Sequence, residues 1–232
     1  MTRLKLLLLS SVLSLLAACG GGGGGGGGTS GPVTSTNTFD IRAGWSRLIA
    51  NGFSKAFVIS GTCSGTDSLT VGPANTSTTF EGGPALSSNY VDSTTLTNCT
   101  PASSIGTVTN YYDSNYIPLG SSVLGGKYEV WAAAPTIPVA AKVGDVGIFG
   151  TVNKYNDSTK AVSAGRQDNS YVIEPDTATS AIANFISKNY NTSNVLTSTE
   201  QDRYRIAADG SMALISIDIQ YANGSTTHLI MN

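Results

Sequence analysis

The chain has 232 residues, and its 13 lysines and arginines against 15 aspartates and glutamates give a net charge of −2 at pH 7. Only 12% of the residues are charged and 40% are hydrophobic, and no cluster of basic residues follows residue 19. We therefore expect no nucleic-acid partner, because nucleic-acid-binding domains carry a basic patch or stripe.

Residues 1–18 have the organisation of a signal peptide. Arg3 and Lys5 form a basic start, and a leucine-rich apolar stretch at 6–16 precedes two small residues. This stretch is roughly half of the ~20 apolar residues that a helix needs to span a bilayer. The pattern therefore predicts a cleaved signal and not a membrane-spanning helix.

The signal segment ends in Leu16-Ala17-Ala18-Cys19. This order resembles the lipobox of bacterial lipoproteins, in which the chain is cleaved before the cysteine and the sulfur takes a diacylglycerol. The resemblance implies lipid attachment at Cys19, and a membrane partner bound stably through two or three N-terminal acyl chains. Because Gly20, and not the aspartate of inner-membrane retention, follows the cysteine, it also implies an outer-membrane location, on the periplasmic or the surface face. An ordinary cleaved signal peptide that ends in cysteine is the alternative.

Residues 19–38 are predicted to form a flexible tether. An unbroken glycine run at 20–28 leads into a stretch rich in Thr and Ser, and such a composition cannot bury a core. Polyglycine after a lipobox resembles a class of uncharacterised proteobacterial envelope lipoproteins. The remaining residues, 39–232, are long enough for one substantial core, and we expect a single β-rich domain there.

One short helix is expected at the start of this domain. Asp40 can cap it and Asn51-Gly52 can end it. The apolar residues between them follow helical spacing, at Ile41, Trp45, Leu48 and Ile49.

The central part of the chain predicts a succession of strands. Its low charge and its many Ser, Thr, Asn and Gly residues suit exposed strand faces better than helix surfaces. Turns are expected at 82–84, 115–120, 125–126 and 156–158, where Gly, Pro, Asn and Asp gather. The strands expected between them are 55–62, 68–72, 78–81, 89–97, 106–112, 128–133, 146–155 and 169–174.

The segment 180–190 is open to two interpretations. Ile182, Phe185 and Ile186 would line one side of a helix capped by Asp176. We favour a strand, because residues 191–194 have the composition of a hairpin turn into the next strand.

The C-terminal segments 195–207, 212–222 and 226–231 predict a three-stranded antiparallel meander. Asp209-Gly210 and Asn223-Gly224, both strong hairpin signals, separate them. Within the middle segment, the alternation places one set of side chains on a buried face: Ile215, Ile217, Ile219 and Tyr221.

These patterns predict an all-β fold in which an antiparallel meander forms a β-barrel-like domain or a sandwich, with the one helix over an open end. Consecutive antiparallel strands with one apolar face must curl, close or be covered. A strongly curved meander would leave a concave apolar surface, which becomes a ligand-binding hypothesis if the cavity is not filled.

The chain contains three cysteines, and lipidation of Cys19 leaves Cys63 and Cys99 as a pair. In an oxidising compartment they predict a disulfide, worth about 3.5 to 4 kcal/mol in the chain-entropy model. A redox or metal role is disfavoured, because the sequence contains no C-x-x-C and its one histidine is distant.

The search for catalytic motifs gives no catalytic residue, no metal site and no cofactor. His228 is expected to be an ordinary strand residue on a polar face. Two acidic groups could form a glycosidase dyad or a calcium site, but solvated faces and turns are the more common explanation. These groups are Glu174 with Asp176, and Asp202 beside Arg203 and Arg205.

An aromatic group, Tyr111, Tyr112, Tyr116 and Trp131, is the candidate for binding sugar, peptide or lipid, although packing within the sheet is the commoner role of such residues. The favoured function is a non-enzymatic binding or structural envelope lipoprotein, with an envelope protein, glycan or lipid as its partner. The alternative is an envelope hydrolase with converging carboxylates. An apolar hollow would support lipid carriage, whereas two carboxylates about 5 to 10 Å apart in a polar cleft would support sugar hydrolysis.

Overall fold

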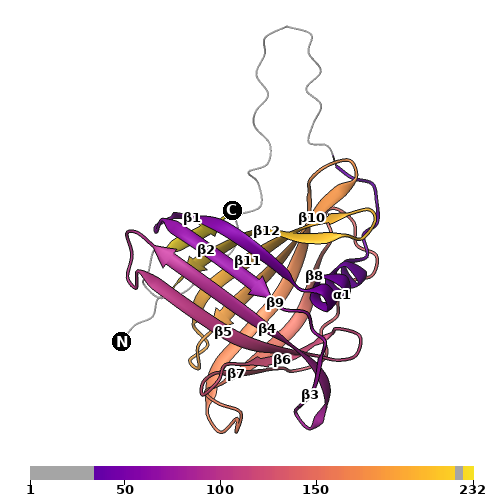
Figure 1. Ribbon diagram of the computed structural model, residues 1–232. Coiled ribbons are helices and arrows are strands. Elements are labelled where there is room, and N and C mark those ends of the chain that lie inside the picture. Colours follow the sequence, from indigo (N-terminus) through magenta and orange to yellow (C-terminus); the bar gives the residue numbers. More distant parts are fainter. Residues whose placement is uncertain (1–33, 223–226) are drawn as a thin grey trace, which may run out of the picture. The chain divides into compact units, whose positions relative to one another are not determined.

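A computed structural model describes residues 34–222 and 227–232 (Figure 1). The predicted signal peptide, the lipidation site Cys19, most of the predicted tether and the Asn223-Gly224 turn lie outside these residues. Ser35, from the last part of that tether, is already buried. Within the described residues, no helix has the length and hydrophobicity needed to cross a membrane.

The described residues form one helix and thirteen strands. Helix α1 spans Ile41–Asn51, as predicted, with Ala43 N donating a hydrogen bond to the capping carboxylate of Asp40 (2.8 Å). The strands are β1 Phe53–Gly61, β2 Gly65–Val71, β3 Thr76–Phe80, β4 Gly83–Leu96, β5 Ser103–Tyr112, β6 Pro118–Ser122, β7 Tyr128–Trp131, β8 Val146–Tyr155, β9 Ser163–Pro175, β10 Ser180–Tyr190, β11 Leu196–Ala207, β12 Met212–Tyr221 and β13 His228–Met231.

Twelve of the strands form a closed antiparallel barrel. From β4 to β13 each strand pairs with the next along the chain, β13 pairs with β1, and β1 pairs with β2. The ring closes because the second half of the long strand β4 pairs with β2, while its first half pairs with the additional strand β3. Closure removes the sheet edges, and the all-β prediction is confirmed in its barrel form (Figure 1).

The width of this barrel matters for its interior. Barrels of about eight strands have a lumen that side chains can fill or that holds one small ligand, and the diameter grows with strand number. A ring of twelve strands therefore encloses more space than its inward-facing side chains need to occupy.

The largest apolar cluster lies on the inner faces of strands from both ends of the chain, where β1 and β2 meet β12 and β13. It includes the buried side chains of Phe57, Ile59, Leu69, Leu214, Ile217, Leu229 and Met231. A second cluster joins the start of α1 to strands β9 to β11, through Phe39, Ile41, Ile173, Ala181, Ala183 and Ile206.

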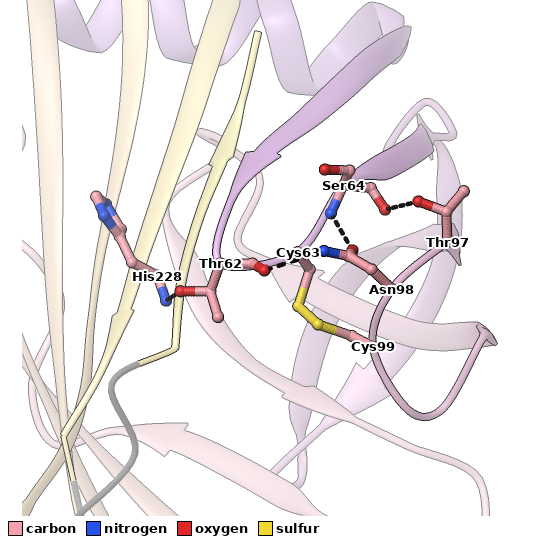
Figure 2. Close-up of a disulfide and its surroundings, with 7 residues drawn as sticks. All are labelled: Thr62, Cys63, Ser64, Thr97, Asn98, Cys99 and His228. Atoms are coloured by element: carbon pink, nitrogen blue, oxygen red, sulfur yellow. Dashed lines mark hydrogen bonds between the residues drawn. A yellow bond between two sulfur atoms is a disulfide. The ribbon is translucent and has the colours of Figure 1, made fainter.

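The predicted disulfide between Cys63 and Cys99 is confirmed, with a Cα–Cα distance of 5.7 Å. It joins the β1–β2 loop to the β4–β5 loop, at the end of β1 opposite to α1. Figure 2 shows how Asn98 reinforces this link: its Oδ1 accepts a hydrogen bond from Ser64 N (2.7 Å), and its Nδ2 donates to Thr62 O (3.3 Å).

The segment 180–190 is strand β10, as favoured. Other expectations are corrected by the structure. The expected turn at 115–120 is shorter, because β6 begins at Pro118, and β4 begins at Gly83, inside the expected turn at 82–84. On β12 the buried residues are Leu214 and Ile217, since a register shift opposite Arg203 and Tyr204 interrupts the alternation at Ile215.

Candidate functional site

The barrel interior contains a cavity of about 470 Å³. Its lining residues come from α1 and from every strand of the ring except β13, so the cavity is the lumen of the barrel. A neighbouring cavity of about 150 Å³ shares Trp45, Trp131, Asp202 and Tyr204 with it and extends to Phe149. The main cavity lies within the roughly 300 to 1,000 Å³ typical of small-molecule sites.

Aromatic side chains form much of the lining. The chain has two tryptophans, and both line the cavity: Trp45 from α1 and Trp131 from β7. The indole of Trp45 is held in place, since its Nε1 donates a hydrogen bond to Tyr116 O (3.2 Å) and its ring packs 5.9 Å from Phe185. The remaining aromatic lining residues are Phe53, Tyr90, Tyr111, Tyr112 and Tyr204.

Carboxylates also face the lumen. Glu200 and Asp202 are alternate residues of β11, so their side chains point to the same, inner side of the barrel and line the cavity, where they hydrogen-bond to each other. Burial raises the pKa of Asp202 well above its usual range, and the charge of Glu200 raises it further. Burial likewise raises the pKa of Glu200. The Oδ1 atom of Asp202 is buried without a hydrogen-bond partner.

A second carboxyl pair lies on the neighbouring wall. Asp67 on β2 is 3% exposed, and its Oδ1 accepts a hydrogen bond from Thr94 Oγ1 (2.9 Å), whereas its Oδ2 is buried without a partner. Asp92 on β4 is half-buried and hydrogen-bonds to Asp67. Burial, this bond and the charges of Asp67 and Glu200 raise the pKa of Asp92 to about 7.

Tyr90 links the two carboxyl pairs. Burial raises the pKa of its phenol, and negative charge raises it further, in order from Asp92, Glu200, Asp202 and Asp67. One cavity-lining residue is therefore within electrostatic reach of all four carboxyl groups. We call these four residues the lumen acid group.

One basic side chain meets the carboxylates of the lumen. Lys154 on β8 lies with its Nζ 3.2 Å from Oε1 of Glu129, a cavity-lining residue of β7, and donates to Asn189 Oδ1 (2.6 Å). In the part of the chain that the structure describes, it is the one cation that forms an ion pair with a cavity-lining carboxylate. Among the described residues, Lys154 forms no ion pair with the lumen acid group, although its charge lowers the pKa of Glu200.

The structure brings three of the four predicted aromatic residues to the cavity. Trp131, Tyr111 and Tyr112 line it, whereas Tyr116 lies behind Trp45, to which it contributes its carbonyl oxygen. Tyr112 is 4% exposed and packs with a cluster that includes Ile49, so it also has the packing role that was the alternative.

Tyr111 has a packing role as well. Its ring stacks 4.5 Å from that of Phe80, and its hydroxyl shares a hydrogen bond with Ser122 Oγ (3.0 Å).

Strand alternation separates Asp202 from the other acidic residues singled out from the sequence, Glu174 and Asp176. Glu174 and Asp176 form ion pairs with Arg203 (3.2 Å) and Arg205 (2.8 Å), while Asp202 faces the lumen. Asp202 is therefore not grouped with the two arginines beside it in sequence, because neighbours along a strand point to opposite faces.

His228 pairs across strands with Gln220 on β12, and its Nε2 lies 2.7 Å from Asp218 Oδ1. Among residues 34–222 and 227–232, no group of three His, Cys, Asp or Glu side chains is placed to hold a metal ion.

Sequence analysis singled out Asp202 but missed Asp67, Asp92 and Glu200, and so missed the lumen acid group as a whole. A usable signal was the register of β11, where Glu200 and Asp202 share one face with the buried residues Tyr204 and Ile206. Comparison of the chain with protein-family models, with curated proteins and with solved structures found no match. The chemistry of the lumen is therefore argued from its own residues.

Proposed function

We propose that this chain is a lipid-anchored lipoprotein of the outer membrane whose barrel binds a small molecule in its lumen without transforming it. The observation that carries the binding proposal is the cavity of about 470 Å³ lined by both tryptophans and by carboxylates. Apolar and aromatic lining with a few placed polar groups is typical of a ligand site. The carboxylates make this lumen unsuitable for a wholly apolar lipid, because they would be buried without partners.

The proposal of a lipid anchor rests on the likeness of Leu16-Ala17-Ala18-Cys19 to a lipobox and on the glycine run that follows. It is tested by labelling cells with radioactive palmitate. We expect label in the wild-type chain and in a Cys63→Ser control, and none in Cys19→Ser. Label that persists in Cys19→Ser would refute the anchor.

The proposal of ligand binding is tested by native mass spectrometry of the full chain purified without denaturation. We expect a species heavier than the covalent mass that loses the excess on unfolding. Trp131→Ala, in the lumen, should lose the bound species, whereas Ile148→Ala should keep it, since Ile148 is 78% exposed and does not line the cavity. A ligand-free mass in the wild-type chain would count against the proposal.

The second candidate is a hydrolase. The hydrogen-bonded pair of Glu200 and Asp202 favours it, because two carboxyl groups that share a proton can activate water. The effect of each carboxyl group on the pKa of the other indicates direct contact, whereas glycoside hydrolysis uses carboxyl groups roughly 5 to 9.5 Å apart. Turnover of glycoside or peptide substrates that Glu200→Gln abolishes would favour the hydrolase over the binding protein.

A further inference from the structure

We propose that the ligand of the lumen is a small organic cation, an amine whose ammonium group lies against Glu200 and Asp202 and whose apolar body packs against Trp45 and Trp131. This inference rests on the proposed binding function and specifies the chemical class of its ligand. It follows from the charge of the lumen, from its unpartnered oxygens and from its aromatic lining.

The charge of the lumen is unbalanced. The lumen acid group consists of four carboxyl groups, and the one cation of the described residues whose charge lowers the pKa of a member, Lys154 acting on Glu200, forms its ion pair with Glu129. Burying carboxylates next to one another is costly unless they stay protonated or meet a positive charge. A bound ammonium group would supply that charge, whereas an anionic ligand would add to the repulsion.

Two oxygens of the lumen acid group have no hydrogen-bond donor apart from the neighbouring carboxyl group of their pair. Asp202 lines the cavity and its Oδ1 is one of these atoms, whereas Asp67, whose Oδ2 is the other, lies on the same face of β2 as the lining residues Leu69 and Val71 without lining the cavity itself. Buried polar atoms are nearly always hydrogen-bonded, so unpartnered acceptors in a hollow mark where a donor is missing. An ammonium group carries only donors and satisfies acceptors of this kind.

The aromatic lining selects an organic cation over a metal ion. Cations are attracted to the faces of indole and phenol rings, and desolvation strengthens the attraction. A calcium ion needs six to eight oxygen ligands, and the residues that the structure describes include no three acidic, His or Cys side chains placed around one point. A cavity of about 470 Å³ is also far larger than a single ion requires.

The test uses three probes with the same phenylbutyl group and different polar groups: 4-phenylbutylamine, 4-phenylbutanol and 5-phenylpentanoate. Because both tryptophans of the full chain line the cavity, its intrinsic fluorescence reports occupancy directly. We expect the amine to bind about tenfold or more tightly than the alcohol, the factor expected for one charge-assisted hydrogen bond, and the carboxylate to bind most weakly.

Variants locate the contact. Asp202→Asn and Glu200→Gln keep the shape of each side chain and should each weaken amine binding about tenfold and alcohol binding much less, because only the amine carries a charge. The control is Asp168→Asn, which removes a carboxylate that is 40% exposed, is paired with Arg166 and does not line the cavity. Its amine affinity should equal that of the wild-type chain.

The outcomes separate this inference from the proposed function. Equal affinity for the three probes, or amine binding that neither lumen variant weakens, would overturn the cationic ligand and leave small-molecule binding intact. No fluorescence response to any probe would contradict both.

Discussion

Replacing Asp92 by asparagine should stabilise the protein at alkaline pH. The pKa of this carboxyl rises from its usual 3.8 to about 7 in the folded chain. The folded state therefore holds a proton that the unfolded state has lost between these two values, so the free energy of unfolding falls as the pH rises from about 4 to 7. Above pH 7 the charged Asp92 stays beside Asp67, and the whole penalty is present.

The pKa values give the size of the effect. A carboxyl whose pKa rises this far on folding costs about 4 kcal/mol once the pH exceeds both values. Because Asp92 is only half-buried, solvent screens part of the repulsion, and we expect about 2 kcal/mol at pH 8. Asparagine keeps the shape, cannot ionise, and can donate a hydrogen bond to Asp67.

Urea unfolding followed by tryptophan fluorescence, at intervals from pH 4 to pH 8, measures this. The difference between Asp92→Asn and the wild-type chain should be near zero at pH 4 and should grow in favour of the variant through pH 7. The control Asp168→Asn loses an outer-wall ion pair worth about 0 to 1 kcal/mol and should never exceed the stability of the wild-type chain. An Asp92→Asn variant less stable than the wild type at pH 8 would refute the reasoning.

Three further predictions concern stability and binding. Replacing Cys63 and Cys99 together by alanine should lower the free energy of unfolding by about 3 to 4 kcal/mol, because their link closes a loop with a sequence separation of 36 residues. Lys154→Met leaves Glu129 without its ion pair, and should cost about 1 to 3 kcal/mol in urea unfolding while tightening binding of 4-phenylbutylamine. Ile206→Ala removes a side chain with 0% exposure and should cost about 2 to 5 kcal/mol in the same assay.

Each of these has a matched control. Dithiothreitol should bring the wild-type chain to the stability of the double cysteine variant and leave that variant unchanged. Lys160→Met removes a cation that pairs with Glu81, and should leave amine affinity as it was, since neither residue lines the cavity. Ile148→Ala, on a 78% exposed side chain, should change the free energy of unfolding by less than about 0.5 kcal/mol. Equal effects of a test variant and its control would refute the corresponding argument.

The sequence predicted those features of the fold that local chemistry decides. Asp40 and Gly52 bound the helix because a capping side chain and a positive-φ residue act over one turn. The strands β10, β11 and β12 followed from alternation and turn signals, and the pairing of Cys63 with Cys99 followed from their number. Closure as a barrel and not a sandwich depends on β2 meeting β4, a contact that no local pattern encodes.

Two strand errors have local causes. The start of β6 has the composition of a turn, yet Pro118 is tolerated there because it is the first residue of the strand. The hairpin before β4 uses only Glu81 and Gly82, both with positive φ, so the strand starts directly at Gly83.

The candidate site was predicted in part. Trp131, Tyr111 and Tyr112 were selected as a sequence cluster, and the fold brings them to one cavity. The lumen acid group was missed, because a polar residue on a strand is normally assigned to the outer face. Asp67 and Asp202 face the interior of the barrel, and a ring of twelve strands is wide enough to hold polar side chains there. The number of strands in the ring is known only from the structure.

The most direct test of ligand binding in the lumen is fluorine NMR of the full chain labelled with 5-fluorotryptophan. Trp45 and Trp131 should give two signals, assigned with Trp45→Phe and Trp131→Phe. If the lumen is the binding site, both signals shift saturably with 4-phenylbutylamine, because both indoles line the same cavity. If neither signal moves at saturating amine, the central claim is contradicted.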